Sequence, residues 1–239
     1  MPFTEHLREL RNRLLVVLVV VGVVGLAMFW PSQFAIPWLT HMYFPGEKLH
    51  AFAPTDVIMA EFKFSLYAAI VIGLPVILYQ IWMFVVPAVN PKTRKAVYLY
   101  VAPSFFLGLL GIAFAHFVVL PRVAWALELM NAKVAESTYG VEPTVNLILL
   151  LLLAFAIVFQ TPVIMILLAR IGIINSQMLR KYRRYAAMGI LLFGGLAAPD
   201  ASPTTMLMIA IPMYLLFEVS IWIIMFLEKS WRRDDAMTA

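Results

Sequence analysis

The sequence contains no cysteine and few charged residues. Cysteine is absent from all 239 residues, which excludes disulfide bonds, thiolate metal ligands and cysteine nucleophiles. Charged residues make up 13% of the chain, whereas a soluble domain usually has about 25%. A chain with so little charge cannot cover a hydrophobic core in water. The composition therefore excludes an ordinary soluble enzyme, a disordered tail and a fibrous repeat.

Apolar residues are correspondingly abundant, at 63% of the chain, and they form long uncharged runs. A helix needs about 20 apolar residues to cross a bilayer. Six segments are candidates, the first closed by Pro31 and the fifth unusually short. They are residues 14–30, 64–89, 96–121, 143–169, 186–198 and 204–227. The sequence thus predicts an all-α integral membrane protein, with residues 1–239 forming a single membrane domain of six transmembrane helices.

Basic residues are distributed unevenly among the segments that connect these spans. Fourteen Lys and Arg residues lie in the termini and in the connections on the same side, and four lie on the opposite side with most of the acids. Because Lys and Arg are retained in the cytoplasm, we expect both termini to be cytoplasmic. Topology explains the basic residues, so no nucleic-acid partner is predicted. Residues 1–35 lack a small-residue cleavage site, and we expect the first span to remain as an anchor.

Proline positions add an expectation about shape. Pro75, Pro103, Pro162 and Pro212 fall inside predicted spans. Each removes a backbone hydrogen bond and bends its helix. We therefore expect the six helices to form a concave cup.

Two polar residues lie deep within apolar spans, Gln160 and Glu218. Each is about 14 Å from the cytoplasmic end of its span at about 1.5 Å per residue, so we expect them at equal depth on a common wall. An ionised side chain near the bilayer centre costs roughly 3 kcal/mol, so Glu218 should be protonated, paired or in a wet cavity. A functional role is one interpretation. The other is structural, with the two residues bonded to each other or to nearby backbone.

The amino-terminal segment carries a second group of polar residues. Thr4 can cap a helix in which Glu9 and Arg13 are spaced to form an ion pair one turn apart. The simple interpretation is a helix on the membrane surface. The functional interpretation is that Glu9 receives a cationic partner at the cytoplasmic interface.

The sequence gives little support for proton relay through histidine, metal binding, phosphate binding or nucleophilic catalysis. His116 is better explained as an interfacial residue than as a proton relay, and Tyr79-Gln80 is a similarly weak candidate. No cluster has metal-ligand spacing, no glycine-rich phosphate loop is present, and no Ser/His/Asp set can be assembled on one face. We therefore predict neither an enzyme nor a cofactor or metal site.

Several motifs occur together and in a characteristic order. They are His6–Arg13 (HLRELRNR), Pro75–Trp82 before Phe84 and Pro87-Ala88, Ala113–Pro121, Ala198–Asp200 and Ala210–Glu218. In these motifs, which cover essentially the whole chain, the sequence resembles the TatC family, the polytopic subunit of the twin-arginine protein translocase. The resemblance implies a receptor for folded proteins that carry a twin-arginine signal. It also implies TatA- and TatB-type single-span partners, self-association, use of the proton-motive force, and the inner membrane of a prokaryote.

The resemblance also implies which residues bind the signal peptide. Glu9 is the glutamate of the amino-terminal motif, and Phe84 precedes the Pro-Ala of the first cytoplasmic loop. Arg11, Thr93 and Arg94 are expected around the same site. A carboxylate binds a guanidinium through two hydrogen bonds, which explains a preference for arginine over lysine.

Two positions of the sequence depart from the family pattern. Thr93 stands where the family usually has a second glutamate, so one signal arginine lacks its expected acidic partner. Gln160 replaces a glutamate, and because an amide cannot titrate, Glu218 becomes the better candidate for proton coupling.

Asp200 lies in the tight outer-face turn between the last two spans. These two spans form a hairpin that is expected to thin the bilayer and receive a partner helix.

Two alternatives to the translocase stay open at this point. One is a proton-coupled small-solute transporter that uses Glu218, with the concave bundle as its cavity. The other is a scaffold that recruits single-span helices.

Overall fold

The computed structural model describes residues 3–46, 49–89, 97–131, 138–170, 172–198 and 203–238. Almost all of these residues are helical, and the β-structure among them is an isolated bridge between His50 and Gly140. The chain divides into two compact units, Met1–Ala156 and Ile157–Ala239.

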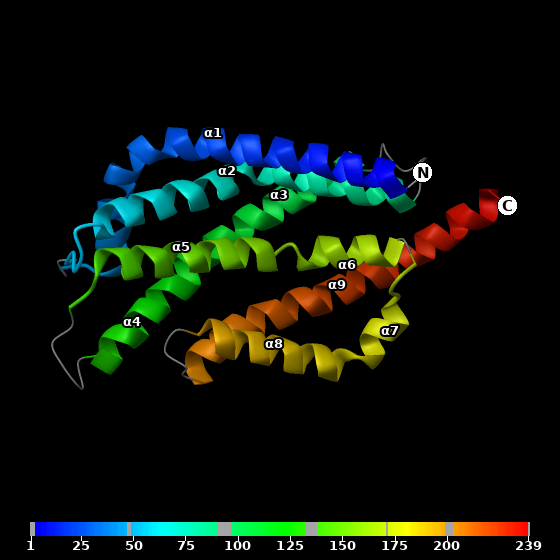
Figure 1. The fold of residues 1–239 in the computed structure, drawn as a ribbon. Helices are drawn as coiled ribbons and strands as arrows, with labels where there is room; N and C mark the ends of the chain where they lie inside the picture. Colours follow the sequence, from blue (N-terminus) through cyan, green and yellow to red (C-terminus); the bar gives the residue numbers. More distant parts are fainter. Residues whose placement is uncertain are drawn as a thin grey trace. The chain divides into compact units, whose positions relative to one another are not determined.

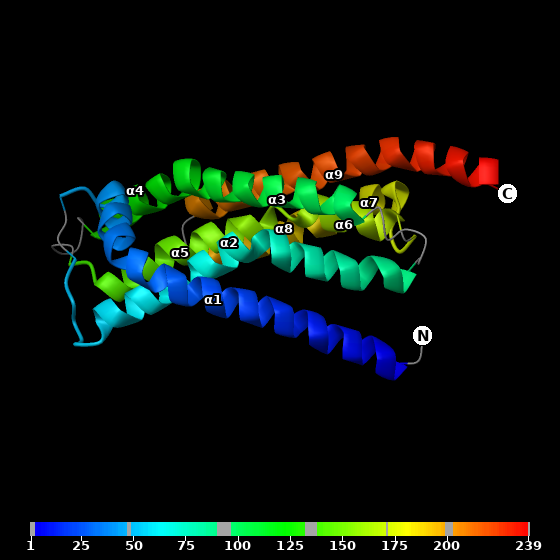
Figure 2. The ribbon, with the colours of Figure 1, turned by 90° about the horizontal axis from the view of Figure 1, so that it is seen from above.

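The first unit is built on two long helices. Helix α1 (Phe3–Tyr43) and helix α2 (Asp56–Val89) pack along each other, as Figures 1 and 2 show. Helix α3 (Val97–Phe114) packs against α2, and a short π-helix (Ala115–Val119) joins it to α4 (Leu120–Asn131). Helix α5 (Val141–Val158) completes the unit and continues past its boundary.

One predicted helix end is wrong in this unit, and a second helical segment runs past the bound of its predicted span. Helix α1 does not end at Pro31 but continues through Pro31 and Pro37 to Tyr43. The helix around Pro121 also continues, through α4 to Asn131. Pro121 is the second residue of α4 and directly follows the π-helix, a type of helix irregularity at which long helices bend. Proline alone therefore did not determine where these helices end.

The second unit contains α6 (Thr161–Arg170), α7 (Ser176–Lys181), α8 (Arg183–Ala197) and α9 (Pro203–Thr238). Helices α8 and α9 pack closely, and a Cβ atom on Gly194 would lie 2.8 Å from the carbonyl oxygen of Met206. Helix α9 is continuous through Pro212 and Glu218 and extends beyond the expected end at residue 227. Its buried face meets α6 around Met165, Ile221 and Ile224.

The disruption of the helix that was expected at Pro162 is confirmed. Helix α5 ends at Val158 and α6 begins at Thr161, so the predicted fourth span is interrupted by a turn at Phe159 and Gln160. A proline at position 162 cannot donate to the carbonyl of Val158, and the hydroxyl of Thr161 donates to that oxygen instead, at 2.6 Å.

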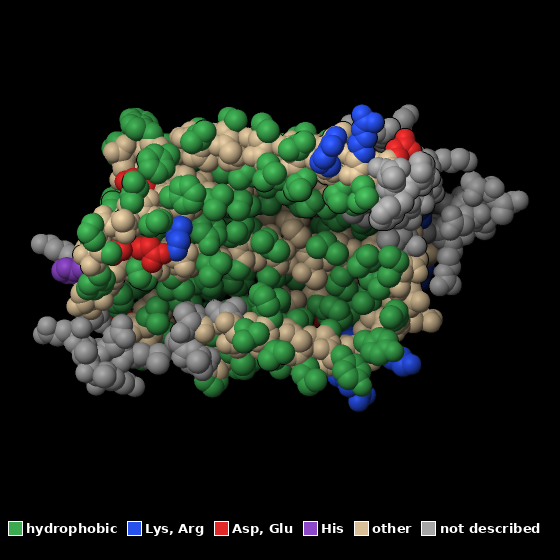
Figure 3. Space-filling view, viewed as in Figure 1, with side chains coloured by type: hydrophobic (Ala, Val, Ile, Leu, Met, Phe, Trp, Pro, Cys, Tyr) green, Lys and Arg blue, Asp and Glu red, His purple; other side chains and the backbone are tan. Residues whose placement is uncertain are grey.

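Within the described residues, five helical segments are long and apolar enough to cross a membrane. They run over Leu7–Tyr43, Asp56–Phe84, Val101–Leu129, Val141–Arg170 and Thr205–Lys229. Helix α8, which corresponds to the short fifth span, has 15 residues, or about 22 Å of helix. Hydrophobic side chains cover most of the face in Figure 3. The protein is therefore a multi-pass membrane protein.

Candidate functional site

Glu9 lies in a small polar network at the amino-terminal end of α1. The Arg13 guanidinium is ion-paired with the Glu9 carboxylate, and Arg13 Nε donates to Glu9 Oε1 at 3.1 Å. Arg13 Nη1 also donates to Gln80 Oε1 of α2 at 3.1 Å. One arginine thus joins the carboxylate to the neighbouring helix. The ion pair was predicted from the four-residue spacing of Glu9 and Arg13, whereas Gln80 of α2 was not predicted as a partner of Arg13.

This network lines a pocket of about 480 Å³, called here the amino-terminal pocket. Its lining residues are Glu5, Arg8, Glu9, Asn12, Arg13, Val16 and Gln80. The Glu9 side chain is 32% exposed and that of Arg13 is 16% exposed, so the carboxylate is the more accessible partner. Two acids and two arginines therefore share one open cavity, a composition suited to a charged, hydrogen-bonding ligand.

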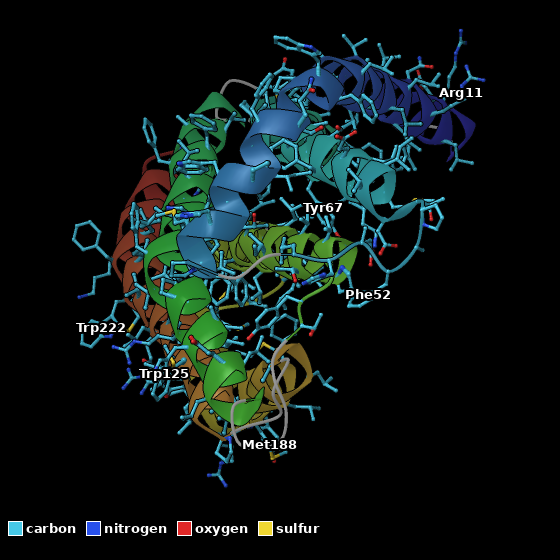
Figure 4. All side chains as sticks on the ribbon, turned by 90° about the vertical axis from the view of Figure 1, so that its left-hand side faces the viewer. Arg11, Phe52, Tyr67, Trp125, Met188 and Trp222 are labelled. Atoms are coloured by element: carbon cyan, nitrogen blue, oxygen red, sulfur yellow. The ribbon has the colours of Figure 1, made fainter. Side chains whose placement is uncertain are left out.

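The other predicted signal-peptide residues are only partly described. Arg11 is exposed, with Asn12 as a hydrogen-bond partner at 3.5 Å, and Figure 4 shows its side chain projecting outward from α1. Phe84 is half-buried on α2, one turn after Gln80, so both side chains lie on the same face of that helix. Thr93 and Arg94 lie outside the described residues, as does Asp200 of the outer-face turn.

Glu218 belongs to a second polar cluster, inside the second unit. Its Oε2 accepts a hydrogen bond from Arg183 Nη2 of α8 at 2.7 Å, and its Oε1 accepts one from the hydroxyl of Tyr214 at 2.9 Å. Glu218 was expected to be protonated, paired or in a wet cavity, and it is paired. Arg183 was missed as its partner, although a basic residue directly before the fifth span was a usable signal.

Gln160 is buried at the turn between α5 and α6. Its backbone N–H donates to the carbonyl of Ile157, and its own carbonyl accepts from Ile164. Within the described residues, Arg183 and Tyr214 bind the Glu218 carboxylate. The direct bond between Gln160 and Glu218, the alternative bond of each to nearby backbone, and their common wall stay predictions.

An apolar pocket of about 240 Å³ lies between α8 and α9 and is called here the hairpin groove. Its lining residues are Ala187, Ile190, Leu191, Leu207, Ala210, Ile211, Tyr214 and Leu215. Tyr214 connects the groove to Glu218 through its hydroxyl. In the part of the chain that the structure describes, no group of three His, Asp or Glu side chains is placed to hold a metal ion.

Comparison with known proteins identifies the family. The sequence model of the Sec-independent protein translocase protein (TatC) matches residues 5–212. The chain belongs to the TatC family. It is 32% identical over 228 residues to TatC of Aquifex aeolicus, covering 93% of this chain and 94% of that protein. It is also 32% identical to TatCy of Bacillus subtilis, covering 93% of this chain and 88% of that protein.

Solved structures agree with this assignment. A crystal structure of the twin-arginine translocase receptor TatC in the detergent DDM superposes with a TM-score of 0.80 at 29% identity, covering 92% of this chain and 99% of that one. A second TatC crystal structure gives a TM-score of 0.77 at 30% identity over 91% of this chain and 96% of that one. The predicted all-α membrane fold is confirmed. As a TatC protein, the chain is a protein-translocase component and not an enzyme, and the small-solute transporter gains no support.

Proposed function

We propose that this TatC protein is the receptor subunit that binds twin-arginine signal peptides in the amino-terminal pocket. It would assemble with TatA- and TatB-type subunits and further copies of itself, and export folded proteins with the proton-motive force. The observation that carries the proposal is the paired Glu9 and Arg13 in an open, charged cavity. Its carboxylate already binds a guanidinium, which is the group that a signal arginine would present.

Arg13 would then occupy the carboxylate when no signal peptide is bound. An incoming arginine can replace Arg13 on Glu9, which keeps the carboxylate paired, while Gln80 keeps one hydrogen bond to the displaced Arg13 guanidinium. A guanidinium offers two parallel N–H donors to a carboxylate, whereas an ammonium is a point charge. The exchange therefore favours arginine over lysine.

Glu5 would serve the second arginine of the signal. The expected loop glutamate is Thr93 here, which leaves one signal arginine without an acid. Glu5 lies one helical turn before Glu9, on the same face of α1, and lines the same pocket. The two carboxylates would thus bind adjacent arginines from a single helix.

Binding of a fluorescent signal peptide to the full chain in lipid nanodiscs tests this proposal. Glu9→Gln should weaken binding at least ten-fold, because hydrogen bonds to charged groups contribute about 1.5–3 kcal/mol. Arg13→Gln should not weaken binding, since it removes the competing guanidinium. Glu128→Gln, an exposed acid on α4, is the matched control. Equal binding of twin-arginine and twin-lysine peptides, or full binding by Glu9→Gln, would refute the proposal.

The hairpin groove would hold the single-span partner helix. It is apolar along its length and ends near the Tyr214 and Glu218 pair, which could bind a polar residue of that helix. Because the chain has no native cysteine, introduced cysteines are unique crosslinking sites. Leu191→Cys and Leu215→Cys should form disulfides with cysteines in a TatA- or TatB-type span, whereas Leu26→Cys on α1, 82% exposed, should not. Crosslinking at residue 26 alone would refute this site.

We further propose that residues 1–239 act as one membrane domain in the cytoplasmic membrane, with both termini in the cytoplasm. The excess of Lys and Arg in the termini and in the connections on the same side supports this orientation. A membrane-impermeant maleimide added to cells with a permeable outer envelope should label Phe52→Cys and leave Asn12→Cys unlabelled. The reverse labelling pattern would refute the orientation.

A further inference from the structure

A second cavity with polar and apolar lining residues lies in the first unit, far from the amino-terminal pocket. It has a volume of about 330 Å³, within the range of about 300–1,000 Å³ typical of small-ligand sites. Gln33, Ile36, Pro37, Thr40 and His41 of α1 line one side, at helical spacing. Val57, Ala60 and Glu61 of α2 line the other, with Leu49 and Val141. We call it the distal pocket.

Glu61 is the acidic residue of the distal pocket. Its side chain is half-buried, and within the described part of the chain no cation or hydrogen-bond donor contacts its carboxylate. The nearest lysine along the helix, Lys63, is ion-paired with Glu142 of α5 instead. A half-buried carboxylate without a partner has lost part of its hydration with no bond in exchange, which is unfavourable. The pocket therefore favours a ligand that carries positive charge and hydrogen-bond donors.

The distal pocket lies about one bilayer thickness from the amino-terminal pocket. The helix from Glu9 to Gln33 is about 36 Å long at about 1.5 Å per residue, and a hydrocarbon core is about 30 Å thick. If Glu9 lies at one interface, the distal pocket lies at the other. Large aromatic side chains on the same two helices are exposed nearby, with Trp30 70%, Phe34 63% and Phe62 60% exposed. Such residues contact lipid at the membrane boundary.

We propose that the distal pocket binds the primary-amine headgroup of a phosphatidylethanolamine-type lipid. The ammonium group would donate a charge-assisted hydrogen bond to Glu61, and its other N–H donors would face Thr40 and Gln33. The acyl chains would lie along the exposed aromatic side chains. A phosphatidylcholine headgroup has the same charge but no N–H donor, so the site would discriminate between two otherwise similar lipids.

Lipid retention by the intact protein tests this inference. The full chain, purified in detergent, is mixed with equal amounts of phosphatidylethanolamine and phosphatidylcholine of identical acyl chains, and retained lipid is measured by native mass spectrometry. We expect at least a five-fold preference for phosphatidylethanolamine. Glu61→Gln should abolish the preference, whereas Glu128→Gln should keep it. The signal-peptide assay on the same samples shows that the variants are folded, and its result does not depend on the distal pocket.

A lipid series on the unchanged protein gives a second measurement that involves no variant. Retention should fall as the amine carries one, two and three methyl groups, because each methyl replaces an N–H donor. Equal retention across the series, or the same loss in Glu61→Gln and Glu128→Gln, would overturn the proposal. Displacement of the lipid by millimolar O-phosphoethanolamine would assign the pocket to a soluble amine and overturn the lipid as its ligand.

Discussion

The Glu218 and Arg183 pair gives the sharpest prediction about stability. Glu218→Gln keeps the size of the side chain and removes its charge, so Arg183 is left with a neutral acceptor. The two side chains are 21% and 37% exposed, so the pair is neither fully buried nor on an open surface. Breaking a fully buried pair costs about 3–5 kcal/mol, and an exposed pair contributes about 0–1 kcal/mol. We therefore expect Glu218→Gln to lower the free energy of unfolding by about 1.5 kcal/mol.

A double-mutant cycle isolates the contribution of the pair. The free energies of unfolding of Glu218→Gln, Arg183→Gln and the double variant are measured by titrating mixed micelles with SDS. The coupling energy should be about 1–2 kcal/mol, because the double variant removes both charges together. The matched control pairs Glu218→Gln with Arg184→Gln, an exposed neighbour that makes no contact with Glu218. That second cycle should be additive.

The outcome that would refute this reasoning is additivity in the first cycle. A coupling energy below about 0.5 kcal/mol is within the usual scatter for independent sites. It would mean that Arg183 does not stabilise Glu218 and that the carboxylate is neutral or solvated. In that case Glu218 would again be available as a proton carrier.

Two further predictions concern helix packing and signal recognition. Gly194→Ala should destabilise the α8 and α9 hairpin by about 1–3 kcal/mol in the same SDS titration, because its Cβ would meet the carbonyl oxygen of Met206 at 2.8 Å. Gly189→Ala, with open space around its Cβ, should be neutral, and an equal loss in both would count against close packing. Signal-peptide binding should weaken as salt rises from 0.05 to 0.5 M, roughly the range over which exposed charges become screened. Salt-independent binding would argue against Glu9 as the acceptor.

The ion pair at the receptor site shows what could be predicted from a local pattern. Glu9 and Arg13 are one helical turn apart, so any helix in that segment brings them together. Gln80 is 67 residues from Arg13 along the chain, and its contact depends on how α1 and α2 pack. Nothing in the sequence indicated how α1 and α2 align along each other. Tyr79-Gln80 was therefore only a weak candidate for a functional site.

The positions of helix ends were harder to predict from the local sequence pattern. Pro31 was expected to close the first span, and the third span was expected to run to residue 121, yet Pro31 and Pro121 both lie inside continuous helical segments. Pro162 does accompany a break, at Phe159 and Gln160. Whether a helix continues through a proline or breaks near it depends on its surroundings. Neighbouring helices and side-chain hydroxyls can bind the backbone carbonyl that loses its N–H donor.

The sequence by itself determined that the chain is an all-helical, multi-pass TatC protein, because long apolar runs without charge are stable only as helices in a bilayer and the motifs occur in the family's order. It also determined the Glu9 and Arg13 pair, since helix geometry fixes contacts over one turn. Only the tertiary structure decided that Arg183 binds Glu218 and that Glu61 lines the distal pocket without a partner among the described residues. Those contacts depend on the register between helices, which the packing of many side chains sets together.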